Sequence, residues 1–290
     1  MKSLSIIIVT YNSQDIIVKC LEHLFLHNDI HEELEVIIVD NSTIEVSTKM
    51  FEMLNEKFPG KLTLIKNDKN GGYGQGNNLG ITYANGKLLA IMNPDIIMTE
   101  PLFKNAINQF KNDWKLAILG YKQYGGFNLS YYTRQEFSLP ILTPFFIKFF
   151  NKINLFSSKY MYLSGAFLFL PKEEFKRIGL FDENIFLYCE ESDITKRALN
   201  KGLKIKFDKS KSYIHEIDER TEMSEPGFGF LLDSTMYYLD KFSFNKKLFL
   251  NKYIFELKIK KGFYKLVNKK EISIILDNQI NQIKERRNSI

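Results

Sequence analysis

The 290-residue sequence is poor in cysteine and has no long uninterrupted apolar segment. Its two cysteines, Cys20 and Cys189, are too few for a disulfide framework and do not indicate a zinc cluster. The early stretch SLSIIIVTYN becomes polar too soon for a signal peptide or a spanning helix, and no other segment is a membrane-spanning candidate. We therefore expect a cytoplasmic protein.

A net positive charge is absent over most of the chain. The net charge is +6, but residues 241–290 contain thirteen Lys or Arg and only four Asp or Glu, so residues 1–240 are slightly acidic. Such a basic region attracts anionic surfaces, either lipid or nucleic acid.

The length of the chain fits one large domain with a smaller appended one. We predict a main domain over residues 1–225 and a basic helical extension over residues 226–290.

Strand-like and helix-like patterns alternate over roughly the first 115 residues. The strand-like runs are SLSIIIVTYN, LEVIIVDNS, KLTLIKND and KLLAIMNPD. This alternation predicts an α/β fold whose mainly parallel sheet is flanked by helices. Three runs end in polar clusters, at Thr10–Asn12, Asp40–Ser42 and Asn93–Asp95. A parallel sheet brings these clusters to one edge, where ligands bind.

A glycine-rich stretch, NGGYGQGNN, occupies residues 70–78 and is predicted to be a loop that opens a helix. Dinucleotide-binding folds place such glycines after the first strand, which here ends in TYNS, so a dehydrogenase of that kind is not expected. The loop could bind a phosphate or a nucleobase through its backbone N–H groups. It could equally be a tight connection that needs positive φ angles.

Several single residues allow both a chemical and a structural interpretation. Asp95 could open a turn, or it could share a divalent cation with His215 and a diphosphate. Asp40 could accept a hydrogen bond from a base or a ribose, or cap a helix. His23, His27 and His31 are spaced four residues apart, and we expect them on a solvated surface.

The acidic cluster CEESD contains Glu190, Glu191 and Asp193, directly before a helical pattern. Acidic residues favour a helix N-terminus, so the cluster could simply complement the helix dipole. Three carboxylates within four positions exceed what capping needs. Like charges near a cleft raise one another's pKa, which can produce a general base.

The aromatic-rich residues 121–165 show little clear periodicity. They could form a β-hairpin and a helix packed on the core, a flexible flap, a wall for an acceptor, or a membrane-contacting element. Within them, LPILTPFFIKFFNKINLF combines lysine with Phe and Ile and suits a membrane interface. A dimerisation or core-packing helix is the alternative.

Together these motifs resemble the family 2 glycosyltransferases of the GT-A fold, in the bacterial rhamnosyltransferase-like and galactofuranosyltransferase-like branch. The resemblance covers residues 3–217 and rests on the order and spacing of SIIIVTYNS, EVIIVDNS, NGGYGQGNNLGI, LLAIMNPD, CEESDITKR and IHE. It implies a GT-A nucleotide-diphospho-sugar transferase fold with a helical C-terminal extension.

The resemblance also implies residue roles. The nucleotide and its sugar are expected near Thr10, Tyr11, Asn12, Asp40, Asn70, Gly71, Asn77 and Asn93, with Asp40 on the uracil or thymine base. Asp95 and His215 would hold Mg²⁺ or Mn²⁺. Gly165 and Ala166 would border the donor sugar and the acceptor. Glu191 is the expected catalytic base, with the neighbouring Glu190 and Asp193 as alternatives.

The implied activity is a metal-dependent, inverting sugar transfer. The first expectation is rhamnose from dTDP-rhamnose; the alternative donor is UDP-galactofuranose, UDP-glucose, UDP-galactose or UDP-N-acetylglucosamine. The expected acceptor is a hydroxyl of a growing, lipid-linked bacterial surface polysaccharide. Peripheral contact with the inner membrane and a homodimer are further expectations.

Two other classes fit the sequence less well. A nucleotidyltransferase would need a glycine-rich basic loop directly after the first strand, and TYNSQD is not one. A nucleic-acid-binding module using the basic tail would not need the carboxylates at 190–193. We therefore expect no nucleic-acid partner.

Overall fold

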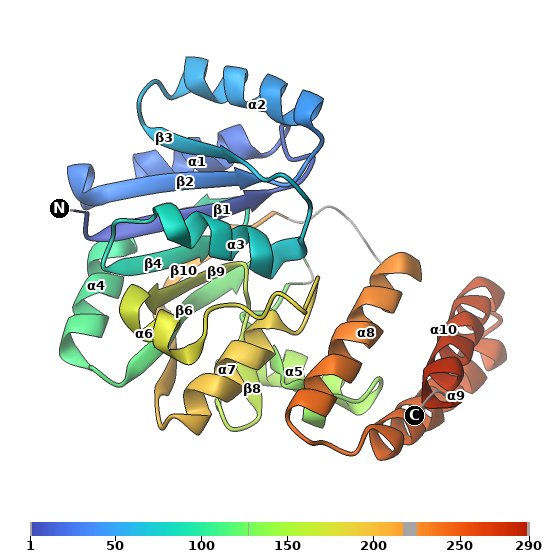
Figure 1. Cartoon of the computed structure of the whole chain (residues 1–290). Helices are drawn as coiled ribbons and strands as arrows, with labels where there is room; N and C mark the ends of the chain where they lie inside the picture. Colours follow the sequence, from blue (N-terminus) through green and yellow to red (C-terminus); the bar gives the residue numbers. More distant parts are fainter. Residues whose placement is uncertain (1, 127, 217–224, 289–290) are drawn as a thin grey trace.

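The computed structural model describes residues 2–126, 128–216 and 225–288 (Figure 1). Over this part of the chain an eight-stranded sheet has the order β3-β2-β1-β4-β9-β6-β10-β5. Its strands are β1 (Leu4–Thr10), β2 (Leu34–Asp40), β3 (Leu62–Lys66), β4 (Leu88–Met92), β5 (Ile96–Met98), β6 (Leu116–Tyr124), β9 (Phe167–Pro171) and β10 (Lys204–His215). A separate antiparallel pair is formed by β7 (Tyr131–Thr133) and β8 (Met161–Leu163).

Helices flank the central sheet and continue beyond it. They are α1 (Ile17–Leu26), α2 (Ile44–Lys57), α3 (Gly72–Tyr83), α4 (Phe103–Asn112), α5 (Leu142–Ile153), α6 (Lys172–Ile178), α7 (Glu190–Asn200), α8 (Glu225–Lys241), α9 (Lys246–Leu266) and α10 (Lys270–Asn288). Short 3₁₀ helices lie at His31–Glu33 and Gln135–Phe137.

The predicted α/β architecture is confirmed. Strand β1 pairs in parallel with β2 and β4, and the register sets Thr10 opposite Asp40. Strand β9 is antiparallel to both β4 and β6, so its first residues, not its last, lie at the carboxyl edge of the parallel strands. The residues at this edge therefore come from the ends of the parallel strands and from the beginning of β9.

Each central strand is buried on both faces, which explains the nearly continuous apolar runs. In β1, Ile6 and Ile8 belong to the cluster packed by α1, α2 and α4. Ile7 points the other way, into the cluster packed by α3, α6 and α7. These two layers fix the positions of the loops that follow the strands.

The glycine-rich stretch is mostly helix, which corrects the prediction of a loop. Helix α3 begins at Gly72, whose φ is +91°. A Cβ atom on Gly80 would lie 2.5 Å from the Cγ2 of Ile7, and one on Gly76 would lie 3.0 Å from Val9. These glycines therefore allow α3 to approach the sheet closely, which their sequence pattern alone does not reveal.

The last three helices share their own apolar cluster, and α8 is the one that lies nearest the sheet domain (Figure 1). The buried Tyr238 of α8 donates a hydrogen bond to Glu136, at 2.7 Å. No helix in the described segments is both long and apolar enough to span a bilayer. The proposed division at residues 225/226 stays a prediction, and residues 217–224 lie outside the described part of the chain.

Candidate active site

A cavity of about 830 Å³ lies between the sheet domain and the C-terminal helices. Several predicted residues line it: Asn93, Gly165, Ala166, Glu190, Glu191 and His215. Its other walls come from residues 128–148 and from α8, α9 and α10. The aromatic middle of the sequence thus forms the antiparallel pair β7–β8 with helix α5 between the two strands, and it also lines this cavity.

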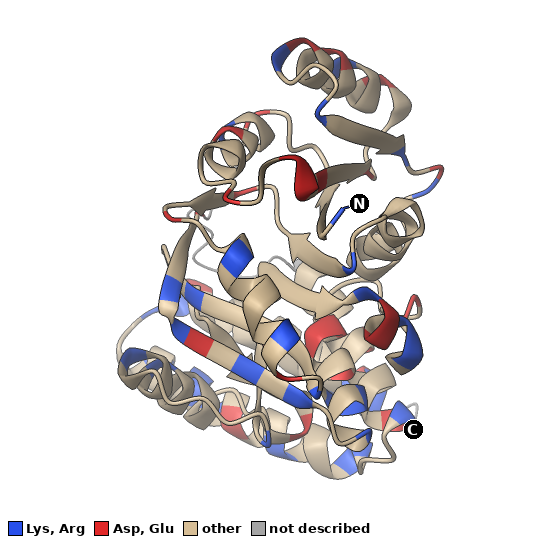
Figure 2. Cartoon of the chain, turned by 90° about the vertical axis from the view of Figure 1, so that its left-hand side faces the viewer, with Lys and Arg blue, Asp and Glu red and all other residues tan. Residues whose placement is uncertain are grey.

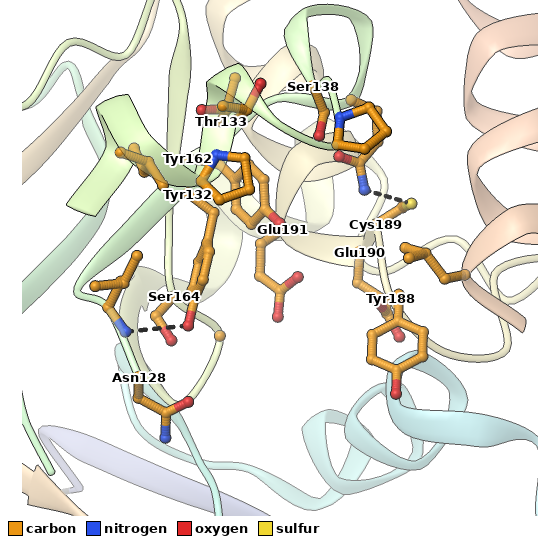
Figure 3. Close-up of a pocket in the computed structure, with 18 of the residues that line it drawn as sticks. Asn128, Tyr132, Thr133, Ser138, Tyr162, Ser164, Tyr188, Cys189, Glu190 and Glu191 are labelled. Carbon is orange, nitrogen blue, oxygen red and sulfur yellow. Dashed lines mark hydrogen bonds between the residues drawn. The ribbon is translucent and has the colours of Figure 1, made fainter. Parts of the chain in front are cut away.

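Glu191 lies at the start of α7 and directs its carboxylate into the cavity (Figure 3). The chain enters α7 through two consecutive left-handed residues, Tyr188 and Cys189, with φ of 69° and 73°. Burial raises the pKa of Glu191 to about 7. A carboxyl group with that pKa is suited to accept a proton near neutral pH.

Gly165 provides the space for this carboxylate. A Cβ atom at residue 165 would lie 1.7 Å from Oε1 of Glu191. The carbonyl oxygen of Gly165 accepts a hydrogen bond from the hydroxyl of Tyr73, at 2.9 Å, which ties this turn to α3. The backbone at Gly165 and the side chain of Glu191 in α7 are therefore packed so closely that no additional atom fits between them.

The two neighbouring acidic residues differ from Glu191. Glu190 is buried, and its Oε1 has no hydrogen-bond partner. Burial, followed by the charge of Glu191, holds the pKa of Glu190 well above its usual range, so its protonated form is favoured. Asp193 is not among the cavity-lining residues; it is fully buried between Arg197 and Lys241, each at 2.6 Å.

Three tyrosines that the sequence did not single out surround Glu191. Tyr132 and Tyr162 face each other on β7 and β8, and both line the cavity together with Tyr73 (Figure 3). Burial, followed by the charge of Glu191, raises the pKa of Tyr73 and of Tyr162. Both therefore remain neutral hydroxyl groups that can hydrogen-bond a sugar. The sequence signal for Tyr132 and Tyr162 is the aromatic content of residues 121–165, and Tyr73 lies in the glycine-rich stretch.

The structure brings Asp95 and His215 together at the paired ends of β5 and β10. Nε2 of His215 lies 3.1 Å from Oδ1 of Asp95, and this buried oxygen makes no hydrogen bond. The other ring nitrogen of His215 lies 2.6 Å from the side-chain amide nitrogen of Asn128. An amide nitrogen donates, so in this orientation Nδ1 accepts and Nε2 carries the hydrogen. The amide turned by 180° would instead accept from Nδ1–H and leave Nε2 free as a ligand.

A carboxylate oxygen that makes no hydrogen bond and lies beside an imidazole nitrogen fits a divalent cation. No group of three or more His, Cys, Asp or Glu in the described residues could hold a metal ion. Mg²⁺ is commonly held by one or two carboxylates together with substrate phosphates. The pair is therefore suited to a cation that arrives with a diphosphate.

The predicted base-binding cluster lies outside the cavity walls. Asp40 is fully buried and accepts hydrogen bonds from Thr10 at 2.7 Å, from Ser42 at 2.9 Å and from Ser47. Ser47 belongs to α2, so Asp40 is tied to this helix by a side-chain hydroxyl, whereas the N-cap of α2 is Thr43. Tyr11 is exposed, and Asn12 has a positive φ of 51°.

The predicted residues at the start of α3 form a polar network beside this cluster. Oδ1 of Asn70 accepts from Gly72 N–H at 3.1 Å, and Gly71 is the N-cap of α3. Asn77 is buried and donates to the carbonyl of Tyr73 at 2.9 Å, while its Oδ1 has no partner.

The histidine triplet is solvated only in part, because Nδ1 of His23 lies 3.1 Å from the carbonyl of Met98.

Comparisons with known proteins agree on one family. The family model described as glycosyl transferase family 2 matches residues 5–179. The rhamnosyltransferase WbbL of Escherichia coli (strain K12) is 27% identical over 263 residues, which cover 81% of this chain and 91% of that protein. The glycosyltransferase GlyG of Streptococcus pneumoniae is 24% identical over 186 residues, which cover 62% of this chain and 58% of that protein.

The fold also matches solved structures. The mannosyltransferase PcManGT from Pyrobaculum calidifontis, solved with GDP-Man and Mn²⁺, superposes with a TM-score of 0.60. The match covers 98% of this chain and 86% of that one, at 13% sequence identity, so it informs on the fold alone. The predicted GT-A fold is confirmed.

Proposed function

Because the chain belongs to glycosyl transferase family 2 and is a nucleotide-sugar glycosyltransferase, we propose that it catalyses an inverting sugar transfer with Glu191 as the base. The observation that carries this proposal is the Glu191 carboxylate, which faces the cavity with a pKa raised to about 7. Neither Glu190 nor Asp193 combines exposure to the cavity with an ionised carboxylate.

In the proposed reaction, Glu191 accepts the proton of an acceptor hydroxyl. The acceptor oxygen forms a bond to the anomeric carbon, while the bond from that carbon to the diphosphate oxygen breaks on the opposite face. The electron pair leaves with the nucleoside diphosphate, and the configuration at the anomeric carbon is inverted. The hydroxyl groups of Tyr73, Tyr132 and Tyr162 are placed to orient the sugars.

Asp95 and His215 would hold a Mg²⁺ or Mn²⁺ ion that arrives with the donor. Such a cation, when bound, supplies positive charge that neutralises the departing diphosphate. The Oδ1 of Asp95, which makes no hydrogen bond and lies 3.1 Å from Nε2 of His215, supports this assignment. Asn128 would act indirectly, because its contact with Nδ1 sets which nitrogen of His215 is available.

The proposed donor is dTDP-rhamnose, which the likeness to a rhamnosyltransferase supports. A UDP-sugar, namely UDP-galactofuranose, UDP-glucose, UDP-galactose or UDP-N-acetylglucosamine, is the alternative. The proposed acceptor is a glycan, carried on a lipid at the cytoplasmic face of the membrane. A homodimer remains part of the proposal and is measurable by light scattering.

A thermal-shift panel of dTDP and UDP sugars, each with and without Mn²⁺, tests the proposal. We expect one donor to raise the melting temperature, and we expect Mn²⁺ to enlarge the shift. A shift with a UDP-sugar alone would replace dTDP-rhamnose as the donor. The absence of a shift with every donor would contradict the proposal, provided that the protein melts cooperatively.

A further inference from the structure

Helix α5 directs large apolar side chains toward solvent. They are 49% to 70% exposed: Leu142, Phe145, Phe146, Phe149 and Ile153. At about 100° of rotation per residue they share one sector of about 100°, opposite the buried Ile147. Lys148 and Lys152 border this sector. The helix therefore has a second apolar face beyond the one that packs on the protein.

Helix α9 also exposes one apolar face to solvent. Its exposed apolar side chains, 51% to 87% exposed, are Leu248, Phe255, Ile259, Phe263 and Leu266. They occupy one side of the helix, opposite the buried Leu250, Ile254 and Leu257. The exposed Lys252, Lys258 and Lys265 lie in or beside this stripe. Two helices far apart in sequence thus expose apolar stripes bordered by lysine.

Both helices border the cavity that contains Glu191. Pro144 and Lys148 of α5 line it, and so do Leu257 and Lys260 of α9. The two helices are also linked directly, because the backbone N–H of Ile141, the N-cap of α5, donates to Glu256 at 2.6 Å. Lys148 is exposed as well as cavity-lining, so the cavity reaches the surface next to the α5 stripe.

The residue types in these stripes indicate which kind of partner binds them. Large exposed apolar patches mark interaction surfaces, but the core of a protein–protein interface is depleted in lysine. Here lysine accompanies both stripes, and residues 241–290 carry nine more positive than negative charges. The face shown in Figure 2, in contrast, mixes acidic and basic residues along its ribbon. Aromatic side chains interspersed with lysine suit the boundary between acyl chains and anionic headgroups.

We propose that α5 and α9 form one docking face for an anionic lipid bilayer, with the apolar stripes below the headgroups and the lysines on the lipid phosphates. Ile147 and Leu257, which line the cavity, lie on the opposite sides of the two helices, so α5 and α9 would separate the cavity from the lipid. A lipid-linked acceptor would reach Glu191 past the edge of α5, where Lys148 is both exposed and cavity-lining. This last step rests on the proposed function, whereas bilayer binding itself does not.

Vesicle flotation of the full chain tests the docking face. Vesicles of phosphatidylcholine with about 30% phosphatidylglycerol are compared with phosphatidylcholine alone. We expect the protein to float with the anionic vesicles and to be released by salt. The double variants Phe145→Ser/Phe149→Ser and Phe255→Ser/Phe263→Ser should each bind roughly tenfold more weakly or worse.

The control is Leu26→Ser/Ile44→Ser, which removes two side chains that are 74% and 75% exposed on other helices. It should float like the unmodified protein. Equal flotation of all variants, or equal binding to neutral vesicles, would overturn the proposal. So would a dimer that the phenylalanine variants dissociate, since a second copy would then cover the face.

Donor-induced thermal shifts on the same proteins separate the two proposals. The phenylalanine variants should retain the donor shift while they lose flotation. Flotation without any donor shift would leave the docking face in place and would contradict the proposed function.

Discussion

Nζ of Lys241 in α8 lies 2.6 Å from Oδ1 of Asp193 in α7, so an ion pair links the C-terminal helices to the helix that carries Glu191. The same lysine lies 2.7 Å from Asp182. Asp193 is fully buried, and Arg197 occupies its other oxygen. Breaking such a pair leaves a buried charge only partly compensated.

We predict that Lys241→Met lowers the free energy of unfolding by about 1–3 kcal/mol, because Arg197 still compensates part of the Asp193 charge. Urea unfolding followed by circular dichroism measures this change. The control is Lys49→Met, which removes the exposed pair with Glu45 and should change stability by less than about 0.5 kcal/mol. Equal effects of the two substitutions would show that the α7–α8 pair does not stabilise the fold.

Substitution of Glu191 by Gln should lower kcat by roughly 10²–10⁴, because the amide cannot accept the acceptor proton. Donor binding should persist, as measured by thermal shift. Glu173→Gln, on the exposed surface of α6, is the matched control and should keep full activity. Full activity of Glu191→Gln would show that the base is another residue.

The rate should also depend on pH in a defined direction. The pKa of Glu191 is raised to about 7, so the ionised base is depleted as pH falls below that value. We expect kcat/KM to be half-maximal near pH 7 and about a hundredfold lower at pH 5. A pH–rate profile measures this, and the residual rate of Glu191→Gln should lose that dependence. A profile that stays flat from pH 5 to 8 would contradict the assignment.

Gly165→Ala should impair catalysis more than folding. The added Cβ would lie 1.7 Å from Oε1 of Glu191, and the flexible glutamate end can move away. A carboxylate displaced by about 1 Å can cost as much as 10² in rate. Gly262→Ala serves as the control, because nothing lies within 4 Å of its added atom. Activity assays beside melting curves distinguish a displaced base from an unfolded protein.

Asp95→Asn should remove the dependence of donor binding on Mn²⁺. The substitution keeps the shape of the side chain and removes the charge that faces a cation beside His215. Thermal shifts with a donor, with and without Mn²⁺, should become equal, as they should in the unmodified protein with excess EDTA. Asp240→Asn, at an exposed pair with Lys246, should leave the Mn²⁺ effect intact.

The sheet could be predicted from the sequence because its strands are buried on both faces. Ile6 and Ile8 pack into one apolar cluster and Ile7 into the other. Because successive residues are buried on opposite faces, the strand appears in the sequence as an unbroken apolar run. The position of β9 between β4 and β6 could not be predicted in this way, because β9 pairs with strands that lie far from it in the chain. Local patterns do not specify such pairings.

The candidate site was predictable in part for a similar reason. Glu191 precedes a helical pattern, so its place at a helix N-terminus could be inferred, and Asp95 follows an apolar run, so its place at an edge of the sheet could be inferred. Asp40 shares that signal but is surrounded by hydroxyl groups from Thr10, Ser42 and Ser47. The positions of Tyr132 and Tyr162 near Glu191 depend on how residues 128–163 return to the sheet, which no periodicity in that segment reveals.

Residues 125–166 leave the sheet at the end of β6 and return to it at the start of β9, its antiparallel neighbour. The two ends of this excursion are therefore held side by side by the sheet, and the free energy of closing the loop varies only slowly with its length. Insertions between β7 and β8, away from Gly165, would therefore leave the strand register unchanged. Under the proposed function, the wall of the cavity that α5 provides can thus diverge between related enzymes while the proposed base stays where it is.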